Sequence, residues 1–122
     1  MSKRVLVVDD QPDNRQIIRD LLAAATDYEL TEAENGEQAL AAVAKQRPDL
    51  ILMDIQLPIM DGYEATRRIK ADPAMRSIPI IAVTSYALSG EEQKARAAGC
   101  DGYVTKPYSP RLLLAKIREF LP

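Results

Sequence analysis

The segment Leu50-Ile51-Leu52-Met53-Asp54 decides the fold of this chain, because it joins an unbroken apolar run directly to an acid. A short apolar run bounded by polar residues is typical of a strand buried on both faces, as in a parallel sheet. Three other runs share this character: Val5–Val8, Ile80–Val83 and Tyr103–Val104. Residues 28–33 alternate in part, which predicts an edge strand with one wetter face.

Helical patterns lie between and after these runs. Their apolar residues recur at helical spacing, and Gly99, Pro48 and Pro73 stand where helices should stop. The expected N-cap residues, whose side chains accept hydrogen bonds from the first backbone N–H groups, are Asn35, Asp61, Ser89 and Ser109, the last followed by Pro110. Strand and helix thus alternate five times. This predicts an α/β fold, with a five-stranded parallel sheet, helices on both faces and right-handed crossovers.

Length and composition indicate one globular domain. The chain has 122 residues, of which 47% are hydrophobic and 28% charged, and no linker-like or repetitive tract divides it. We expect a single domain over residues 1–122, without an output domain. A net charge of −2 with no long basic run argues against nucleic acid as a partner. No apolar stretch approaches the ~20 residues of a membrane span, and the N-terminus lacks the features of a signal peptide.

Cysteine and histidine usage narrows the possible metal chemistry. The single cysteine, Cys100, cannot form an internal disulfide, which fits a cytoplasmic protein. Without histidine, a site for zinc or another metal that prefers soft ligands is disfavoured. A hard cation bound by oxygen atoms remains open.

Polar residues end several of the predicted strands. Asp9-Asp10 follows the first strand, Asp54 the third and Thr84 the fourth, and Lys106 follows the fifth. Each residue alone is more often a cap or turn residue than part of a site. Ligands of open α/β sheets, however, bind outside the carboxyl ends of the strands, and all these residues fall on that edge. If the first and third strands are neighbours, their acids converge.

A cluster of acids at this edge requires compensation. Two carboxylates about 4 Å apart repel by roughly 4 kcal/mol at an effective dielectric constant near 20. Such a cluster shifts its pKa values or binds a cation, and oxygen ligands indicate Mg²⁺. A carboxylate nucleophile beside Mg²⁺ can form an aspartyl phosphate, with Lys106 and Thr84 binding the phosphoryl oxygens. The residues therefore predict a site for phosphoryl transfer.

At this point the sequence resembles the receiver domain of two-component response regulators, from about residue 3 to the end. The resemblance lies in four segments: Val5–Asp10, Asp54–Gly62, Ala82–Ser85 and Tyr103–Pro107. It implies a flavodoxin-like, doubly wound fold with strand order 2-1-3-4-5. It also implies a cis peptide bond between Lys106 and Pro107, which proline makes physically accessible.

The resemblance implies a role for each matching residue. Asp54 is the expected phosphoacceptor, and the expected Mg²⁺ ligands are Asp9, Asp10, Asp54 and the backbone carbonyl of Gln56. Of the acidic pair, Asp10 is expected to bind the ion directly and Asp9 to act mainly through water. Lys106 is expected to pair with the acceptor and the phosphoryl group.

The resemblance also implies a switch and its tuning. Thr84 would bond the phosphoryl group, and Tyr103 would change rotamer on phosphorylation. Gln56 and Tyr86 flank the pocket, and we expect them to control the access of water to the acyl phosphate. A bulky Tyr86 in the path of attack predicts a long-lived phosphoryl group.

The expected function is that of a single-domain response regulator rather than a conventional enzyme. The phosphodonor would be a histidine kinase or a histidine phosphotransfer protein, docked near Asp13, Asn14 and the start of the first helix. Phosphorylation would alter the surface of the fourth helix, fifth strand and fifth helix, which contacts an unidentified protein. Three alternatives are a receiver module of a hybrid kinase, a flavodoxin-like cofactor binder and a metal-dependent phosphohydrolase. The acids after the first strand would repel a cofactor's phosphate, and the chain is short for a hydrolase with a substrate pocket.

Overall fold

The predicted parallel sheet forms the centre of the molecule in a computed structural model, which describes residues 3–25, 27–85 and 90–121. Its strands are β1 (Lys3–Val8), β2 (Tyr28–Ala33), β3 (Leu50–Asp54), β4 (Ile80–Thr84) and β5 (Gly102–Thr105). They pair in the order β2-β1-β3-β4-β5, and each pair is parallel. The predicted strand order is therefore confirmed, and β1 and β3 are neighbours as the convergence of their acids requires.

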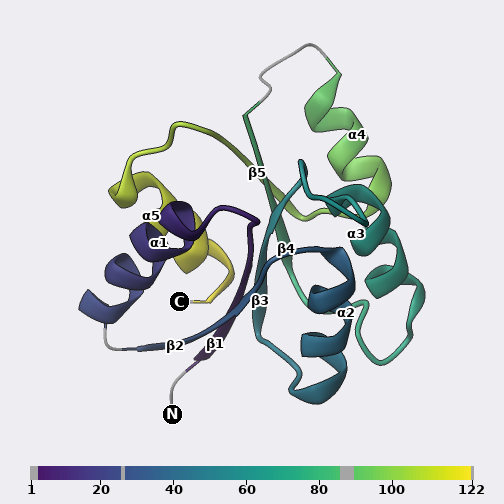
Figure 1. Cartoon of the computed structure of the whole chain (residues 1–122), viewed down its shortest axis with the longest axis horizontal. Helices are drawn as coiled ribbons and strands as arrows, with labels where there is room; N and C mark the ends of the chain where they lie inside the picture. The colour runs from purple at the N-terminus through teal and green to yellow at the C-terminus, as the bar shows by residue number, and fades with distance from the viewer. Residues whose placement is uncertain (1–2, 26, 86–89, 122) are drawn as a thin grey trace.

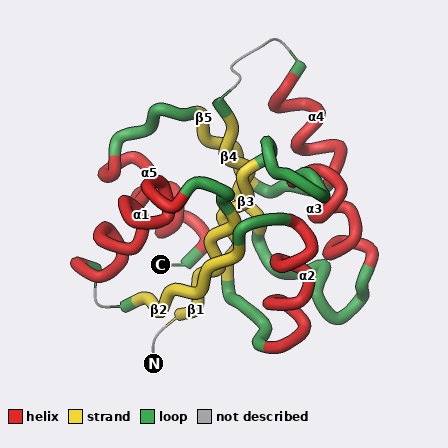
Figure 2. Tube along the Cα trace, viewed as in Figure 1, coloured by secondary structure: helices red, strands yellow, loops and turns green. Residues whose placement is uncertain are grey.

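Helices cover both faces of this sheet. They are α1 (Pro12–Ala24), α2 (Gly36–Lys45), α3 (Gly62–Ala71), α4 (Glu91–Ala98) and α5 (Pro110–Phe120). Helices α1 and α5 lie on one face, and α2, α3 and α4 lie on the other (Figures 1 and 2). This is the two-faced α/β arrangement that the alternating pattern predicts.

The core consists of two apolar layers, one on each face of the sheet. Along β1, Leu6 and Val8 pack into the layer beneath α2 and α3, whereas Val5 and Val7 pack into the layer beneath α1 and α5. This alternation follows from the twofold period of side chains along a strand. Every residue of β3 and β4 is buried, which explains why these strands are apolar without interruption. Strand β2 lies at the edge of the sheet, and three of its six residues are exposed, as its mixed sequence predicts.

Three of the predicted N-caps are confirmed. The side chains of Asn35, Asp61 and Ser109 accept hydrogen bonds from backbone N–H groups in the first turns of α2, α3 and α5. Gly99 ends α4 at φ 112°, a left-handed conformation that suits glycine. Ser89 lies outside the described residues, and Gly90 directly precedes α4. None of the helices in the described part of the chain combines the length and apolar character needed to cross a membrane.

Candidate functional site

The carboxyl ends of the central strands bring the predicted site residues to one edge of the sheet. Val8 pairs with Met53 across β1 and β3, so the acids that follow both residues lie at the same level. Asp54 pairs with Val83 of β4, and Thr84 pairs with Thr105 of β5. Parallel pairing thus gathers residues that are far apart in the sequence into a single site.

Three carboxylates meet at this edge. One oxygen from each of Asp9, Asp10 and Asp54 lies within 4.8 Å of the others. Asp9 and Asp54 are buried, with exposed fractions of 3% and 4%, whereas Asp10 is exposed. The backbone N–H of Gln11 donates to Asp9 Oδ1 over 2.9 Å, which orients that carboxylate. A group of buried and exposed carboxylates with oxygen-only donors fits a hard divalent cation such as Mg²⁺.

Lys106 lies between the two buried acids. Its Nζ donates to Asp9 Oδ2 over 3.0 Å and to Asp54 Oδ2 over 3.1 Å. The backbone places this side chain, because Lys106 N–H donates to the carbonyl of Thr84 and the following bond to Pro107 is cis, as expected. One ammonium therefore partly neutralises two buried carboxylates.

Burial and neighbouring charge determine the protonation of the buried groups. Burial raises the pKa of Asp54 and the charge of Asp9 raises it further, while Lys106 and the Gln56 N–H partly offset this rise. For Lys106, burial lowers the pKa, but the hydrogen bond to Asp9 and the charge of Asp54 outweigh burial and leave the pKa raised. Lys106 therefore stays charged, whereas the ionised form of the Asp54 carboxylate is destabilised.

The loop after β3 holds the Asp54 carboxylate from the other side. The backbone N–H of Gln56 donates to Asp54 Oδ1 over 3.0 Å, so both carboxylate oxygens have partners. Gly62 starts α3 against this backbone, and a Cβ at that position would lie 2.3 Å from the carbonyl oxygen of Asp54. The requirement for glycine at this position was not predicted from the sequence, although the pair Asp61-Gly62 at the start of a helix indicates it.

The Gln56 side chain adds a contact that sequence reasoning missed. Its Nε2 donates to Thr84 Oγ1 over 2.9 Å, and its Oε1 accepts from the backbone N–H of Ser85 over 3.2 Å. Thr84 is fully buried. Gln56 thus contacts both the acid at the end of β3 and the hydroxyl at the end of β4.

Tyr103 of β5 is half-buried and packs against the apolar layer under α2 to α4. Burial raises the pKa of its phenol, and the acidic residues Glu91 and Glu92 of α4 add to this rise. The half-buried position of Tyr103 supports its expected role as a switch, which stays a prediction. Tyr86, the other aromatic residue expected near the site, lies outside the described residues.

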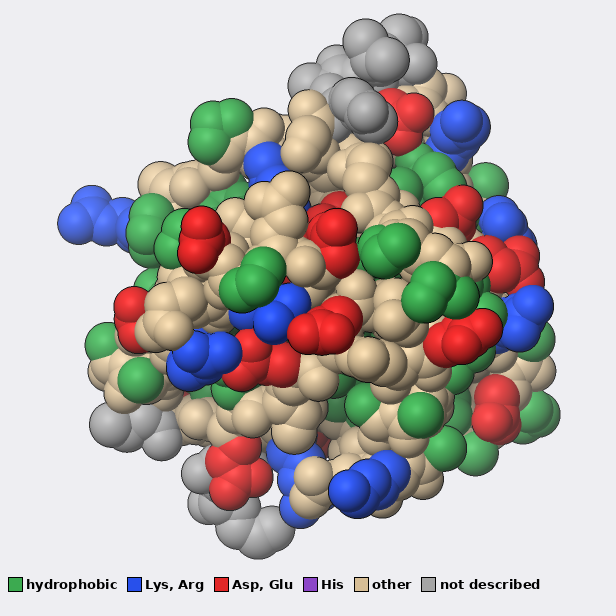
Figure 3. Space-filling view, in the orientation of Figure 1, with side chains coloured by type: hydrophobic (Ala, Val, Ile, Leu, Met, Phe, Trp, Pro, Cys, Tyr) green, Lys and Arg blue, Asp and Glu red, His purple; other side chains and the backbone are tan. Residues whose placement is uncertain are grey.

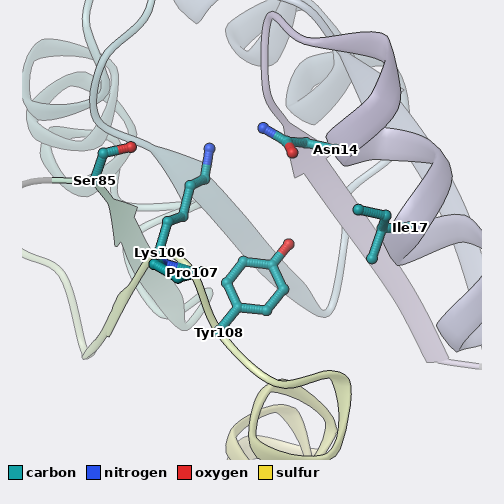
Figure 4. A pocket seen from close by; sticks show the side chains of 6 residues that line it. All are labelled: Asn14, Ile17, Ser85, Lys106, Pro107 and Tyr108. Atoms are coloured by element: carbon teal, nitrogen blue, oxygen red, sulfur yellow. The ribbon is translucent and has the colours of Figure 1, made fainter.

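A pocket of about 460 Å³ opens beside Lys106. Asn14 and Ile17 line it from α1, Ser85 lines it from the end of β4, and the remaining lining residues follow β5: Lys106, Pro107 and Tyr108 (Figure 4). In the space-filling view, acidic and basic side chains meet near the middle of the face, with separate hydrophobic side chains around them (Figure 3). One side of the lysine therefore borders this pocket.

Comparison with known proteins identifies the family of this chain. Residues 5–118 match the response regulator receiver domain. A relative from Brucella anthropi, the polar-differentiation response regulator DivK, is 43% identical over 99% of this chain and 98% of that protein. DivK from Brucella ovis is 41% identical over the same shares.

Solved structures agree with this comparison. The chemotaxis regulator CheY4 of Vibrio cholerae superposes with a TM-score of 0.92 at 31% identity, covering 98% of this chain and 99% of that one. The receiver domain of the sensor histidine kinase PA1611 from Pseudomonas aeruginosa superposes with a TM-score of 0.90 at 36% identity, covering 99% of this chain and 98% of that one. That structure holds a magnesium ion in its active-site cleft. With its acidic edge, its bridging lysine and these likenesses, the chain belongs to the family of response regulator receiver domains.

Proposed function

We propose that Asp54 accepts a phosphoryl group from the phosphohistidine of a histidine kinase or a histidine phosphotransfer protein. One observation carries this proposal: Asp54 is a buried carboxylate at a strand end, 3.1 Å from Lys106 and grouped with two further acids. The proposal makes the chain a signalling switch that catalyses only its own phosphorylation and dephosphorylation. The proposal thus names the residue of this chain that would carry out the receiver activity of the family.

The proposed transfer is a displacement at phosphorus. A carboxylate oxygen of Asp54 forms a new bond to phosphorus, while the bond from phosphorus to the donor's imidazole nitrogen breaks and its electron pair stays on that nitrogen. Asp54 must be ionised to attack, so Lys106 has a catalytic role in stabilising the carboxylate against the burial that raises its pKa. Positioning and neutralisation of charge supply most of the rate in such reactions.

The acidic residues provide the proposed Mg²⁺ site. Its ligands would be Asp10, Asp54 and the backbone carbonyl of Gln56, with Asp9 acting mainly through water. Asp10 is the exposed acid of the three, which supports its role as a direct ligand. When bound, Mg²⁺ would neutralise charge on the phosphoryl oxygens.

The phosphorylated state would be read out through Thr84 and Tyr103. We propose that Thr84 donates to a phosphoryl oxygen and that Tyr103 turns inward, changing the surface formed by α4, β5 and α5. A local change of charge then biases an equilibrium between two conformations. The Thr84 hydroxyl is buried next to the site and Tyr103 lies one strand away, which supports this route. The downstream partner would be another protein.

The surface around the pocket suits the docking of the phosphodonor. Among the described residues, the large apolar side chains that are exposed are Ile17 (47%), Ile59 (75%) and Leu112 (59%). Ile17 lines the pocket beside Lys106, and Ile59 follows Asp54 by one short loop. Ile59 also has a φ of 69°, a strained conformation for a β-branched residue, and such strain concentrates at functional sites.

We therefore propose that the donor presents an apolar surface around its phosphohistidine, with polar contacts to Asp13 and Asn14 at the start of α1. Because kinases draw their phosphoryl group from ATP, we place this reaction in the cytoplasm, where a lone buried thiol such as Cys100 stays reduced. The likeness to a receiver domain of a sensor kinase gives a second candidate, a module of a hybrid kinase, with the same chemistry at Asp54.

The test is incubation with acetyl phosphate and Mg²⁺, followed by intact mass spectrometry. We expect a gain of one phosphoryl group, lost in Asp54→Asn and absent when a chelator removes the metal. Asp13→Asn is the control, because it removes an exposed acid outside the cluster of three. An adduct that persists in Asp54→Asn would contradict the assignment of the acceptor.

A further inference from the structure

The side chain of Gln56 joins the loop after β3 to the end of β4. Its Nε2 lies 2.9 Å from Thr84 Oγ1, and its Oε1 lies 3.2 Å from the backbone nitrogen of Ser85. The backbone N–H of the same residue donates to Asp54 Oδ1. One residue therefore contacts both the proposed acceptor and the hydroxyl proposed to bind the phosphoryl group.

Ser85 determines the direction of the hydrogen bond between Gln56 and Thr84. A backbone N–H can only donate, so the oxygen of the Gln56 amide must face Ser85 and its nitrogen must face Thr84. The amide nitrogen also only donates, so Thr84 Oγ1 is the acceptor of that bond. The hydroxyl proton of Thr84 must then point away from Gln56.

We propose that Gln56 is a positioning residue that sets the direction of the Thr84 hydroxyl, so that its proton is aimed at the phosphoryl group on Asp54. This inference rests on the proposed function. A hydroxyl that accepts from an amide and donates to an anion is part of a chain of hydrogen bonds in which each bond strengthens the next. Because Thr84 is fully buried, bulk water does not compete for this orientation.

Gln56→Glu reverses the polarity of this contact with little change in shape. A carboxylate only accepts, so it can still serve the Ser85 N–H but would now draw the Thr84 proton toward itself. The hydroxyl then loses its donor function toward the phosphoryl group. The added negative charge has a separate effect, which the experiment must remove.

A double-mutant cycle separates the two effects. The four proteins are wild type, Gln56→Glu, Thr84→Val and the double variant, each checked by thermal unfolding. The measured quantity is the affinity for beryllium trifluoride in Mg²⁺, followed by NMR, since this anion imitates a phosphoryl group. We expect Gln56→Glu to weaken binding by about tenfold to about a hundredfold more in the threonine background than in the valine background.

Two further variants control for charge and for loss of the amide. Gln11→Glu adds a charge near the acids on an exposed residue whose side chain bonds Asn14, and it should have equal effects in both backgrounds. Gln56→Met adds no charge and should give an intermediate loss that also depends on Thr84.

The outcomes distinguish this inference from the proposed function. Equal effects of Gln56→Glu in the two backgrounds would overturn the positioning role, while binding by the wild type would leave the proposed function intact. A wild type that neither binds the anion nor forms an adduct at Asp54 would overturn both.

Discussion

Asp54 shows how its surroundings change the chemistry of a single residue. An aspartate in water is fully ionised at neutral pH, but burial beside Asp9 raises the pKa of Asp54 and leaves its ionised form destabilised. Lys106 offsets only part of this cost. The folded protein thus gives up stability to keep this proposed phosphoacceptor buried beside the Lys106 ammonium.

This cost predicts a pH-dependent effect of Asp54→Asn on stability. Because the folded pKa is raised above the unfolded value of about 3.9, the folded state binds the proton more tightly. Protonation of Asp54 therefore increases the free energy of unfolding of the wild type below the unfolded pKa. This contribution is lost as the pH rises through the folded pKa. We expect Asn to stabilise the protein at pH 7, by on the order of 1 kcal/mol, and the advantage to shrink as pH falls toward 4.

Urea unfolding of both proteins across this pH range, without divalent cations, measures the difference. Asp101→Asn is unsuitable as a control because Asp101 pairs with Lys70, so the exposed Asp13→Asn is preferable. An advantage of Asp54→Asn that is the same at pH 4 and pH 7 would contradict the raised pKa.

At the scale of elements, the start of α3 and the end of β3 pack without space for a side chain. A Cβ at Gly62 would lie 2.3 Å from the carbonyl oxygen of Asp54 and 2.8 Å from the Cα of Ile55. Both contacts are with backbone, so a new side chain cannot be accommodated by a change of rotamer. The position of Asp54 and the position of α3 therefore depend on one another.

Gly62→Ala should accordingly destabilise the protein by about 3 kcal/mol and slow phosphorylation of Asp54, because the strand end must move. Gly90→Ala is the matched control: among the residues that the structure describes, no atom lies within 4 Å of an added Cβ, and the cost comes from the φ of 92° at this position. We expect that cost to be about 1 to 2 kcal/mol, with phosphorylation less affected.

Thermal or urea unfolding gives the stability of each variant, and intact mass after acetyl phosphate gives its rate of phosphorylation. If both glycine variants slowed phosphorylation equally, the close contact at Gly62 would not be what positions Asp54.

For the whole molecule, the site unites strands that are distant in the sequence, so a ligand bound there should stabilise the entire fold. Asp9 and Lys106 lie 97 positions apart, yet they are bonded in the folded state. A ligand that binds only this state raises stability by mass action.

Mg²⁺ at about a hundred times its dissociation constant should therefore add about 2.7 kcal/mol to the free energy of unfolding. Asp10→Asn should abolish most of this gain, because it removes the exposed acid of the cluster. Asp13→Asn should keep the gain.

Thermal unfolding with increasing Mg²⁺ measures this effect. A gain that survives Asp10→Asn unchanged would place the cation elsewhere.

The sequence by itself determined the fold and the edge at which the site lies. An uninterrupted apolar run such as Leu50–Met53 is stable as a strand when both of its faces are buried. Asp54, Thr84 and Lys106 each follow such a run. Parallel strands then force these ends together. Periodicity and strand ends are local properties, so a single sequence reveals them.

Only the tertiary structure decided which atoms meet at that edge. The bridging of Asp9 and Asp54 by one ammonium and the contact of Gln56 with Thr84 join separate strand ends. The close approach of Gly62 to Asp54 folds the loop after β3 back onto its own strand. Such contacts depend on strand register and on side-chain rotamers, which residue spacing does not encode. Residue types and strand ends thus predicted which groups gather at the site, whereas the direction of its hydrogen bonds came from the packing of the whole chain.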